Sequence, residues 1–277
     1  AGWCFLQFYS EFLSDVPAIK NKNNRKFQDP MGGMIMDKHN SIPFLELRQV
    51  NKTFTLPSGA VTALEHVSLT INNGELVAIV GPSGSGKTTL LNIIGSLDRP
   101  SEGEVILEGI RIDTLSEEDL VHFRREKFSF IFQDAKPLRM LNVLENTLLP
   151  FNFFKPKNRN GNIKNEGIEI IKSLGLGHRI YHMPSQLSGG EIQRVAIARA
   201  LITHPAMILA DEPTANLDRG NRLFVIDTFR KLSKEKGIAV VFSTHDIEIA
   251  NKADRIVHLK DGVFLKDETI SCTPCPV

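Results

Sequence analysis

Short apolar runs of strand length recur along the chain. The segments Leu76–Val80, Ala206–Ala210 and Ala239–Phe242 are continuously apolar, as is typical of strands that are buried on both faces of a parallel sheet. A later strand is expected at Arg255–Leu259, where an Asp261-Gly262 turn follows. With helical segments between them, these runs predict the α/β fold class, with a mostly parallel sheet flanked by helices.

Helical patterns lie between these strands. Helices are expected at about Lys87–Ser96, Ser116–Arg125 and Ile192–Ile202, and Ser116 is expected to cap the second of them. The sequence therefore predicts one helix directly after the strand Leu76–Val80 and one shortly before the strand Ala206–Ala210.

A helical insert is predicted at about residues 134–190. It contains the apolar segment Leu141–Leu149 and then Lys155–Asn165, which is rich in Lys, Asn and Gly and is expected to be a mobile loop. The basic side chains of this loop are expected to be solvated, and contact with an anionic lipid or a partner protein is the alternative.

A smaller antiparallel sheet is predicted beside the parallel one. Phe44–Phe54 and Val61–Ile71 have the pattern of two strands, and the turn-forming sequence Pro57-Ser58-Gly59 separates them. Glu104–Leu107 is expected to be a third, shorter strand of this sheet.

The two ends of the chain differ from the segment between them. Residues 1–40 combine an aromatic, apolar start with a basic, polar stretch, and the first residues are Ala-Gly-Trp rather than Met. They are expected to be a leader or an appended segment outside the fold. The chain after about Asp267 is expected to be loose. The prediction is therefore one folded domain at residues 44–270 and a tail at residues 271–277.

Composition narrows the classes of protein to which the chain can belong. Of its 277 residues, 42% are hydrophobic and 23% are charged, which excludes disorder throughout the chain. No apolar run reaches the roughly 18–20 residues that a membrane-spanning helix needs. The formal net charge of +1 gives no general reason to expect nucleic acid as a partner. Three cysteines, Cys4, Cys272 and Cys275, form no complete disulfide framework, which favours a reducing compartment.

The first chemical motif follows the strand Leu76–Val80 directly. It consists of Gly81, Pro82, Ser83, Gly84, Ser85, Gly86, Lys87, Thr88 and Thr89, and it matches the pattern G-x-x-x-x-G-K-[ST]. Its glycines allow several backbone N–H groups to point at one anion, and the helix after the loop adds its positive end. Lys87 is expected to contact the β- and γ-phosphates and Thr88 to bind Mg²⁺. The motif predicts an NTP-binding P-loop core without separating kinases, GTPases and ATPases.

A pair of acids, Asp211 and Glu212, follows the strand Ala206–Ala210. The C-terminal ends of parallel strands are the place where α/β sheets bind ligands. Asp211 is expected to hold Mg²⁺, and Glu212 is expected to polarise an attacking water from the other side of the backbone. An ordinary solvated strand end is the alternative, and the phosphate loop upstream argues against it.

A second anion site is expected at the start of the helix Ile192–Ile202. Ser188 and Glu191 have the spacing of a capping box. Gly189 and Gly190 leave backbone N–H groups bare at the positive end of the helix. Taken alone, the pattern is also explained by structural capping of the helix.

Together these three motifs resemble those of the ATP-binding cassette (ABC) family, and the resemblance covers about Phe44–Lys266. Gly81–Thr89 is similar to the Walker A loop of that family, Met207–Glu212 to its Walker B strand and Leu187–Glu191 to its signature sequence. The resemblance implies a P-loop NTPase core, a small antiparallel β subdomain and a helical subdomain that carries the signature.

Four further positions match the family in order and spacing. Gln133 lies where the Q-loop glutamine belongs, Ala215–Asp218 matches the D-loop, and His245 matches the switch histidine. Phe54 fits the aromatic residue that stacks on adenine. The alternatives are a surface amide for Gln133, a strand-end histidine for His245, and core packing for Phe54.

The resemblance also implies which residues serve which role. The residues implied in catalysis are Glu212, His245 and Gln133, and those implied in Mg²⁺ binding are Thr88, Gln133 and Asp211. The residues implied in ATP binding are Phe54, residues 81–89, Ser188, Gly189, Gly190 and Asp218.

In this family two cassettes dimerise head to tail, so that the signature of one copy covers ATP on the Walker A loop of the other. The resemblance therefore implies a homodimer that sandwiches two ATP molecules and drives a transmembrane permease. Contact with the membrane is expected only through that permease, at the inner, cytoplasmic face of the cell membrane, and no nucleic acid is expected.

Motif spacing separates several kinds of ABC protein. A DNA-repair type needs a long coiled coil between the motifs, and the 124 residues between Lys87 and Asp211 leave no room for one. A translation-type factor needs two cassettes, and the sequence holds one set of motifs. Leu97–Glu104 and Arg124–Gln133 are similar to a subgroup that includes lipoprotein-releasing and macrolide-exporting ATPases and a cell-division ATPase. An importer ATPase and a non-transport ATPase on a membrane or cell-division complex stay as alternatives.

Overall fold

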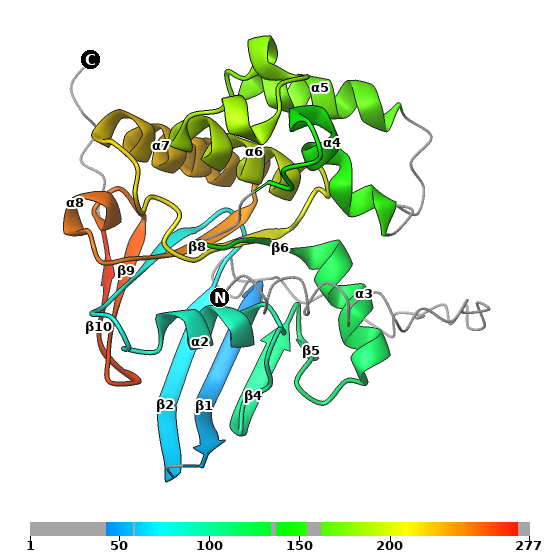
Figure 1. Cartoon of the computed structure of the whole chain (residues 1–277). Coiled ribbons are helices and arrows are strands. Elements are labelled where there is room, and N and C mark those ends of the chain that lie inside the picture. Colours follow the sequence, from blue (N-terminus) through cyan, green and yellow to red (C-terminus); the bar gives the residue numbers. More distant parts are fainter. Residues whose placement is uncertain (1–42, 58, 134–136, 154–161, 271–277) are drawn as a thin grey trace, which may run out of the picture.

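The computed structural model describes residues 43–57, 59–133, 137–153 and 162–270. The expectations for residues 1–40, for residues 271–277 and for all three cysteines fall outside these ranges. Within them, two β-sheets and a set of helices form stacked layers (Figure 1). The division of the chain into a leader, a domain and a tail stays a prediction.

The larger sheet has six strands. They are β3 (Leu76–Val80), β6 (Phe128–Ile131), β7 (Met207–Ala210), β8 (Ala239–Thr244), β9 (Arg255–Lys260) and β10 (Val263–Thr269). Their order is β10-β9-β3-β8-β7-β6, and every neighbouring pair is parallel except β9 and β10. Strands β3, β7 and β8 are buried along their whole length, which explains why β3 and β7 are continuously apolar rather than alternating and why β8 is apolar as far as Phe242.

The smaller sheet is antiparallel. Its strands are β1 (Leu45–Leu56), β2 (Gly59–Ile71), β4 (Glu102–Leu107) and β5 (Ile110–Arg111), in the order β2-β1-β4-β5. Irregularities in the pairing of β1 with β2 lie between Leu47 and Thr53. The predicted antiparallel subdomain is confirmed, with one short strand more than the sequence indicated.

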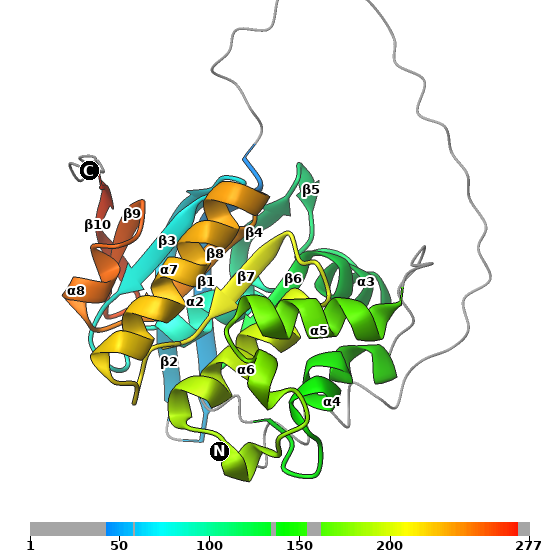
Figure 2. The same ribbon diagram turned by 90° about the horizontal axis from the view of Figure 1, so that it is seen from above.

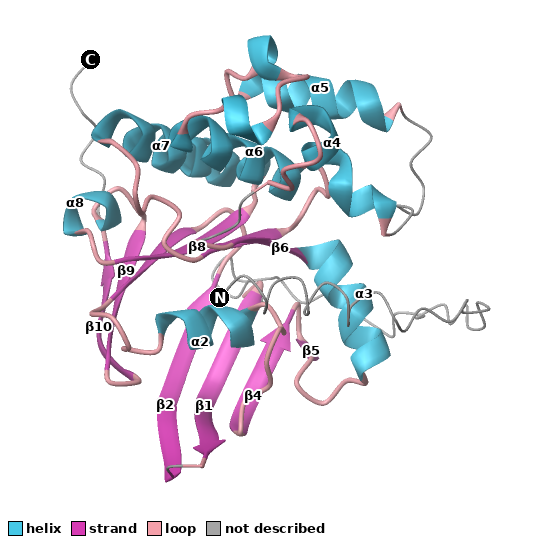
Figure 3. Ribbon diagram, viewed as in Figure 1, coloured by secondary structure: helices cyan, strands magenta, loops and turns pink. Residues whose placement is uncertain are grey.

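Helices surround the larger sheet (Figure 3). The α-helices are α2 (Lys87–Ile94), α3 (Glu117–Lys127), α4 (Val143–Leu148), α5 (Ile163–Ser173), α6 (Gly189–Leu201), α7 (Arg219–Lys236) and α8 (Ile247–Ala250). Short 3₁₀ turns cover Leu149–Asn152, Gly177–Arg179 and Pro184–Gln186. Each helix in the described ranges is too short or too polar to cross a lipid bilayer.

Alternate residues of β3 divide the core into two layers. Leu76 and Ala78 pack in a cluster with apolar side chains of α6 and α7, on the face where α4 and α5 also lie. Val77 and Ile79 face the other way and pack with α2 and the antiparallel sheet. The views from the side and from above agree, with α7 crossing over the larger sheet beside α6 (Figures 1 and 2). The α/β fold class is thus confirmed, and the period of two along β3 assigns the layers.

Several elements were not predicted from the sequence, among them α7, β6 and β10. The longest helix, α7, has signals at both ends, because Asp218 caps its N-terminus and Gly237 ends it in a left-handed conformation. Strand β6 has only four residues and directly follows α3, so the change from helix to strand leaves little pattern to detect. Strand β10 is mostly polar because it lies at the edge of the sheet.

Two expectations about loops are corrected in part. Residues 155–161 of the predicted loop Lys155–Asn165 lie outside the described residues, but its last residues belong to helix α5, because the side chain of Asn162 accepts hydrogen bonds from the N–H groups of Lys164 and Asn165 and starts the helix there. The expectation of a loose chain after about Asp267 is wrong for the residues described there, up to Ile270. Asp267 pairs with Arg255 of β9, and β10 continues to Thr269.

The turn between β9 and β10 joins the two sheets to the loop after β3. The N–H of Gly262 donates to the carbonyl oxygen of Ser85 at 3.1 Å, and the carbonyl oxygen of Gly262 accepts from the N–H of Glu65 in β2 at 2.9 Å. Gly262 has φ +80°, and a Cβ atom there would lie 2.8 Å from the carbonyl oxygen of Ala63. Both the backbone conformation and the close approach therefore require glycine.

Gly262→Ala tests this junction. The substitution is expected to lower the free energy of unfolding by about 2–4 kcal/mol, because left-handed strain and a steric clash add. Gly109→Ala is the matched control, since Gly109 has φ +79° but no atom within 4 Å of its Cβ position, and it should lose only about 1 kcal/mol. Urea unfolding followed by circular dichroism measures both, and equal losses in the two variants would contradict the role of the close approach.

Candidate functional site

The loop from Gly81 to Gly86 connects β3 to α2 and curls around the side chain of Lys87. The ammonium group of Lys87 donates to the carbonyl oxygens of Gly81 at 2.9 Å and Pro82 at 2.8 Å. Gly86 has φ +100°, and a Cβ atom there would lie 2.5 Å from the carbonyl oxygen of Ala63. The loop therefore closes on its own lysine at the N-terminal, positive end of α2.

Most of this loop faces solvent. Pro82, Ser83, Gly84 and Thr88 are exposed, whereas the hydroxyl of Ser85 is buried and has no hydrogen-bond partner among the described residues. Helix α2 has no side-chain cap at its start, so its first N–H groups stay available for an anion. Thr89 is half-buried in the first turn of α2.

A chain of hydrogen bonds links the ends of β3, β8 and β7. The hydroxyl of Thr88 donates to Oδ2 of Asp211 at 2.7 Å, and the hydroxyl of Ser243 donates to Oδ1 of the same carboxylate at 2.6 Å. Ser243 Oγ in turn accepts from the backbone N–H of Glu212 at 2.8 Å. Both carboxylate oxygens of Asp211 are therefore held by hydrogen bonds. Ser243 also orients the next residue, Glu212.

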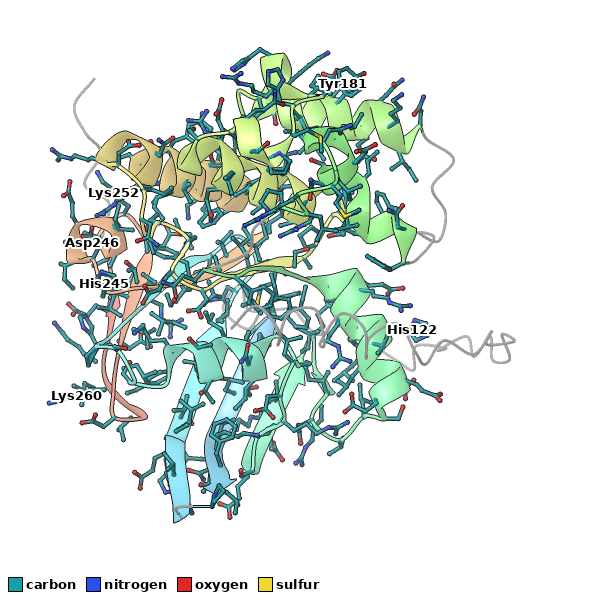
Figure 4. The ribbon with its side chains drawn as sticks, viewed as in Figure 1. His122, Tyr181, His245, Asp246, Lys252 and Lys260 are labelled. Atoms are coloured by element: carbon teal, nitrogen blue, oxygen red, sulfur yellow. The ribbon has the colours of Figure 1, made fainter. Side chains whose placement is uncertain are left out.

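Glu212 and His245 form a second pair beside this chain. Glu212 has φ +45°, which is uncommon for a residue other than glycine. One of its carboxylate oxygens, Oε2, lies 3.5 Å from Nδ1 of His245. His245 is exposed and lies next to Asp246 at the start of α8 (Figure 4). The strained backbone of Glu212 turns its side chain toward the histidine rather than toward the partners of Asp211.

The start of α6 has the capping box that the sequence predicted. The hydroxyl of Ser188 accepts from the N–H of Glu191, and Oε2 of Glu191 accepts from the N–H of Ser188 at 2.8 Å. Oε1 of Glu191 accepts from Arg179 at 3.0 Å. These N–H donors hold the pKa of Glu191 below its ordinary value of 4.5, the N–H of Ser188 more than Arg179, while partial burial opposes the shift.

The two glycines after Ser188 differ in their surroundings. Gly189 has no atom within 4 Å of its Cβ position, whereas a Cβ atom on Gly190 would collide with the side chain of Asn221 in α7. Asn221 also accepts from Arg194 of α6 at 3.0 Å. Gly190 therefore permits the contact between α6 and α7, whereas Gly189 is exposed and free of close contacts at its Cβ position.

Asp218 caps α7. Its carboxylate accepts from the backbone N–H and from the side-chain amide of Asn221, and the backbone bond is the main reason that its pKa lies below the ordinary value of 3.8. Asp218 was expected to contact ATP, and in this chain its side chain serves the N-terminus of its own helix.

The remaining predicted residues lie apart from this network. Phe54 is 38% exposed on β1, so the alternative of core packing does not apply to it. Gln133 is exposed, two residues after the end of β6, and residues 134–136 that follow are not described. Among the described residues, no hydrogen bond or ion pair joins Ser188, Gly189 or Gly190 to the phosphate loop or to Asp211.

Three residues that hold the site residues in place were given no role in the sequence prediction. Ser243 bridges Asp211 and Glu212, Asn221 joins α6 to α7, and Arg179 holds Glu191. Ser243 had one available signal, because it lies near the C-terminal end of a predicted buried strand, where α/β sheets place their functional groups.

Comparison with known proteins places the chain in a family. Residues 64–215 match the family model for ABC transporter. The lipoprotein-releasing system ATP-binding protein LolD of Shewanella denitrificans is 43% identical over 229 residues, which are 83% of this chain and 97% of that protein. The chain belongs to the ABC transporter family.

Two further relatives differ in how much of their length is matched. The macrolide export ATP-binding/permease protein MacB of Rhodopirellula baltica is 41% identical over 223 residues, which are 80% of this chain and 33% of that protein. The chain thus spans about a third of this MacB relative. The post-hydrolysis dimer of the ATP-binding cassette MJ0796 of Methanocaldococcus jannaschii, bound to ADP and Pi, has a TM-score of 0.75 and 42% identity, over 82% of this chain and 98% of that one.

Glu191→Gln tests the electrostatics of the α6 start. Glutamine keeps the capping geometry but carries no charge, so the wild type should be more stable near pH 7 by about 0.5–1 kcal/mol. Because the folded pKa of Glu191 is lowered, this advantage is present above the ordinary value of 4.5 and is lost as the pH falls through the folded value. Urea unfolding from about pH 7 to about pH 3 measures the difference, with Glu169→Gln on the exposed face of α5 as the control for removal of one charge. An advantage that stays constant over this range would contradict the assignment.

Proposed function

We propose that this chain is an ATP-binding and ATP-hydrolysing cassette that drives a membrane permease, of the export or lipoprotein-release type. The observation that carries the proposal is the continuous hydrogen-bond chain from Thr88 through Asp211 and Ser243 to Glu212, beside a phosphate loop that encloses Lys87. It brings a hydroxyl, a carboxylate and a second, separate carboxylate to one edge of the sheet. Such a set suits transfer of a phosphoryl group to water.

ATP is proposed to bind with its phosphates on residues 81–89. The ammonium of Lys87 then exchanges carbonyl oxygens for phosphate oxygens, and the free N–H groups of α2 donate to the β-phosphate. The purine is proposed to stack on Phe54, whose ring is exposed. Phe54 pairs with Val61 of β2. Two residues further along β2 is Ala63, and its carbonyl oxygen lies close to the Cβ position of Gly86 in the phosphate loop. The backbone pair of Phe54 and Val61 thus lies roughly 7 Å along the strand from Ala63.

The residues present also fit Mg²⁺. The hydroxyl of Thr88 and the carboxylate of Asp211 are hard oxygen donors within 2.7 Å of each other, and Mg²⁺ is commonly held by one or two such groups together with phosphates and waters. Gln133 is proposed as a further oxygen donor. When bound, the ion neutralises charge on the phosphate oxygens.

Glu212 is proposed as the general base. Its carboxylate accepts a proton from the attacking water as the water oxygen bonds to the γ-phosphorus and the bond to the β,γ-bridging oxygen breaks. The N–H bond to Ser243 orients Glu212, and His245 at 3.5 Å is placed to bind the γ-phosphate and to steady the base. Gln133 is proposed to help position the water.

A second copy of the chain is proposed to complete each site. Ser188, Gly189 and Gly190 present a capped helix start with open N–H groups, and among the described residues of one chain they have no bond to the phosphate loop. The similar cassette MJ0796 forms a dimer in its complex with ADP and Pi, which supports the same assembly for this chain. In this proposal the signature residues of one copy cover the ATP on the phosphate loop of the other. Each ATP site is then built from both copies.

The permease is proposed to dock on the outer end of the helical region. Met140 and Tyr181 are 89% and 65% exposed, and the N–H of Val143 donates to the carbonyl oxygen of His182 at 3.0 Å, which brings their two segments together. Tyr181 points away from both sheets (Figure 4). The names of the LolD and MacB relatives support export or lipoprotein release as the process, with a permease as partner and membrane contact through it.

Glu212→Gln tests the catalytic assignment. The variant should bind ATP with unchanged affinity, lose at least about 100-fold in hydrolysis because the base is removed, and elute as a dimer in Mg-ATP. Phosphate release and size-exclusion chromatography measure these effects. Glu169→Gln should behave as the wild type, and Lys87→Ala should lose binding itself. Wild-type turnover in Glu212→Gln would falsify its role as the base.

Met140→Ser combined with Tyr181→Ser tests the docking surface. Hydrolysis by the isolated chain should not change, because neither residue lies near the proposed site. Co-purification with a permease co-expressed with the chain should fall by about ten-fold or more, as is usual when two exposed apolar anchors are removed from an interface. Ile110→Ser on β5, which is 47% exposed, is the control, and equal recovery of the permease in both variants would contradict this surface.

A further inference from the structure

Lys52 and Phe54 lie two residues apart on β1, and their side chains meet. The ammonium nitrogen of Lys52 lies over the Phe54 ring, 4.9 Å from the ring centroid. This is within the distance at which a cation is attracted to the negative face of an aromatic ring. One face of Phe54 is therefore occupied by a positive charge from its own strand.

Lys52 is held firmly in that position. Its ammonium donates to Oδ1 of Asp98 at 2.6 Å and to the carbonyl oxygen of Arg99 at 2.8 Å, and its side chain is only 13% exposed. These two acceptors provide the pairing that a nearly buried charged group requires. The cation is thus a fixed feature of the ring's surroundings rather than a mobile surface charge.

Asp98 connects this pair to the phosphate-binding helix. The N–H groups of Leu97 and Asp98 both donate to the carbonyl oxygen of Asn92, in the last turn of α2. The position of Lys52, and through it that of the Phe54 ring, is therefore set relative to the helix that carries Lys87 and Thr88 at its start. The Phe54 ring and the phosphate loop are therefore both fixed to helix α2.

The opposite face of Phe54 has no such cover among the described residues. The ring is 38% exposed, and its cross-strand neighbour Val61 is 50% exposed. An ammonium on one face draws the π-electrons toward itself, which leaves the other face less negative. A less negative face is a better stacking partner for an electron-rich purine.

We propose that Lys52 is a positioning residue for the nucleobase, which holds the Phe54 ring between its ammonium and the purine. This inference rests on the proposed function, in which Phe54 receives the base of ATP. Lys52 does not touch the phosphates, so its effect should be confined to ligands that carry a base.

Lys52→Met removes the charge and keeps an unbranched apolar side chain. The dissociation constant for ATP, measured by calorimetry on the full chain with Mg²⁺, should rise by about three- to ten-fold. The dissociation constant for inorganic tripolyphosphate, which has no base, should not change. Lys52→Arg should retain wild-type affinity for ATP, because the guanidinium also stacks on aromatic rings. Lys127→Met is the matched control, since Lys127 makes a similar 2.6 Å ion pair with Glu108 away from Phe54.

Two further variants separate the proposal from a structural role. Lys52→Met with Asp98→Asn removes the carboxylate that would be left unpaired, and it should show the same loss for ATP alone. In a Phe54→Leu background, Lys52→Met should cause no further loss, because its effect passes through the ring.

These measurements separate the role of Lys52 from ATP binding by the chain itself. A parallel loss of tripolyphosphate affinity, a continued loss in the Phe54→Leu background, or ATP affinity equal to that of Lys127→Met would each overturn the role of Lys52 while leaving ATP binding by the chain intact. Failure of the wild type to bind ATP would instead overturn the proposed function, and the inference with it.

Discussion

The hydrogen bond between Thr88 and Asp211 is the contact on which the rest of the site depends. It joins two residues that are 123 positions apart in the chain, and it forms because β8 lies between β3 and β7 in a parallel sheet. Parallel pairing aligns the C-terminal ends of these strands, so that the phosphate loop, Ser243 and the two acids meet at one edge. If β8 paired elsewhere, the same residues would be ordinary strand ends.

The antiparallel sheet adds a second constraint. It fixes the position of the Phe54 ring relative to the phosphate loop. On one side Lys52 ties β1 to the end of α2 through Asp98. On the other side Gly262 ties β2 to the carbonyl oxygen of Ser85. A rigid connection at both places reduces the conformational entropy that the chain would lose if it had to order the two parts of the proposed nucleotide site on binding.

The helical region is organised around the start of α6 rather than around the phosphate loop. Glu191 is shared between the cap of α6 and Arg179, and Gly190 allows α6 to lie against Asn221 at the start of α7. Asp218 at that same start accepts a hydrogen bond from the backbone N–H of Asn221 in its own helix. Packed contacts therefore connect the starts of α6 and α7 within the helical region.

The sequence by itself determined the elements whose signals are local. The continuous apolar strands, the phosphate loop after β3 and the capping serines Ser116 and Ser188 depend on residues within a few positions of one another, and the structure contains each of them. Only the tertiary structure decided the bridge from Ser243 to Asp211 and the cation of Lys52 over Phe54, with its partner Asp98. The two bridging contacts, Ser243 to Asp211 and Lys52 to Asp98, join residues that are 32 and 46 positions apart. Strand order and side-chain packing create such contacts, and no short-range pattern of polar and apolar residues encodes them.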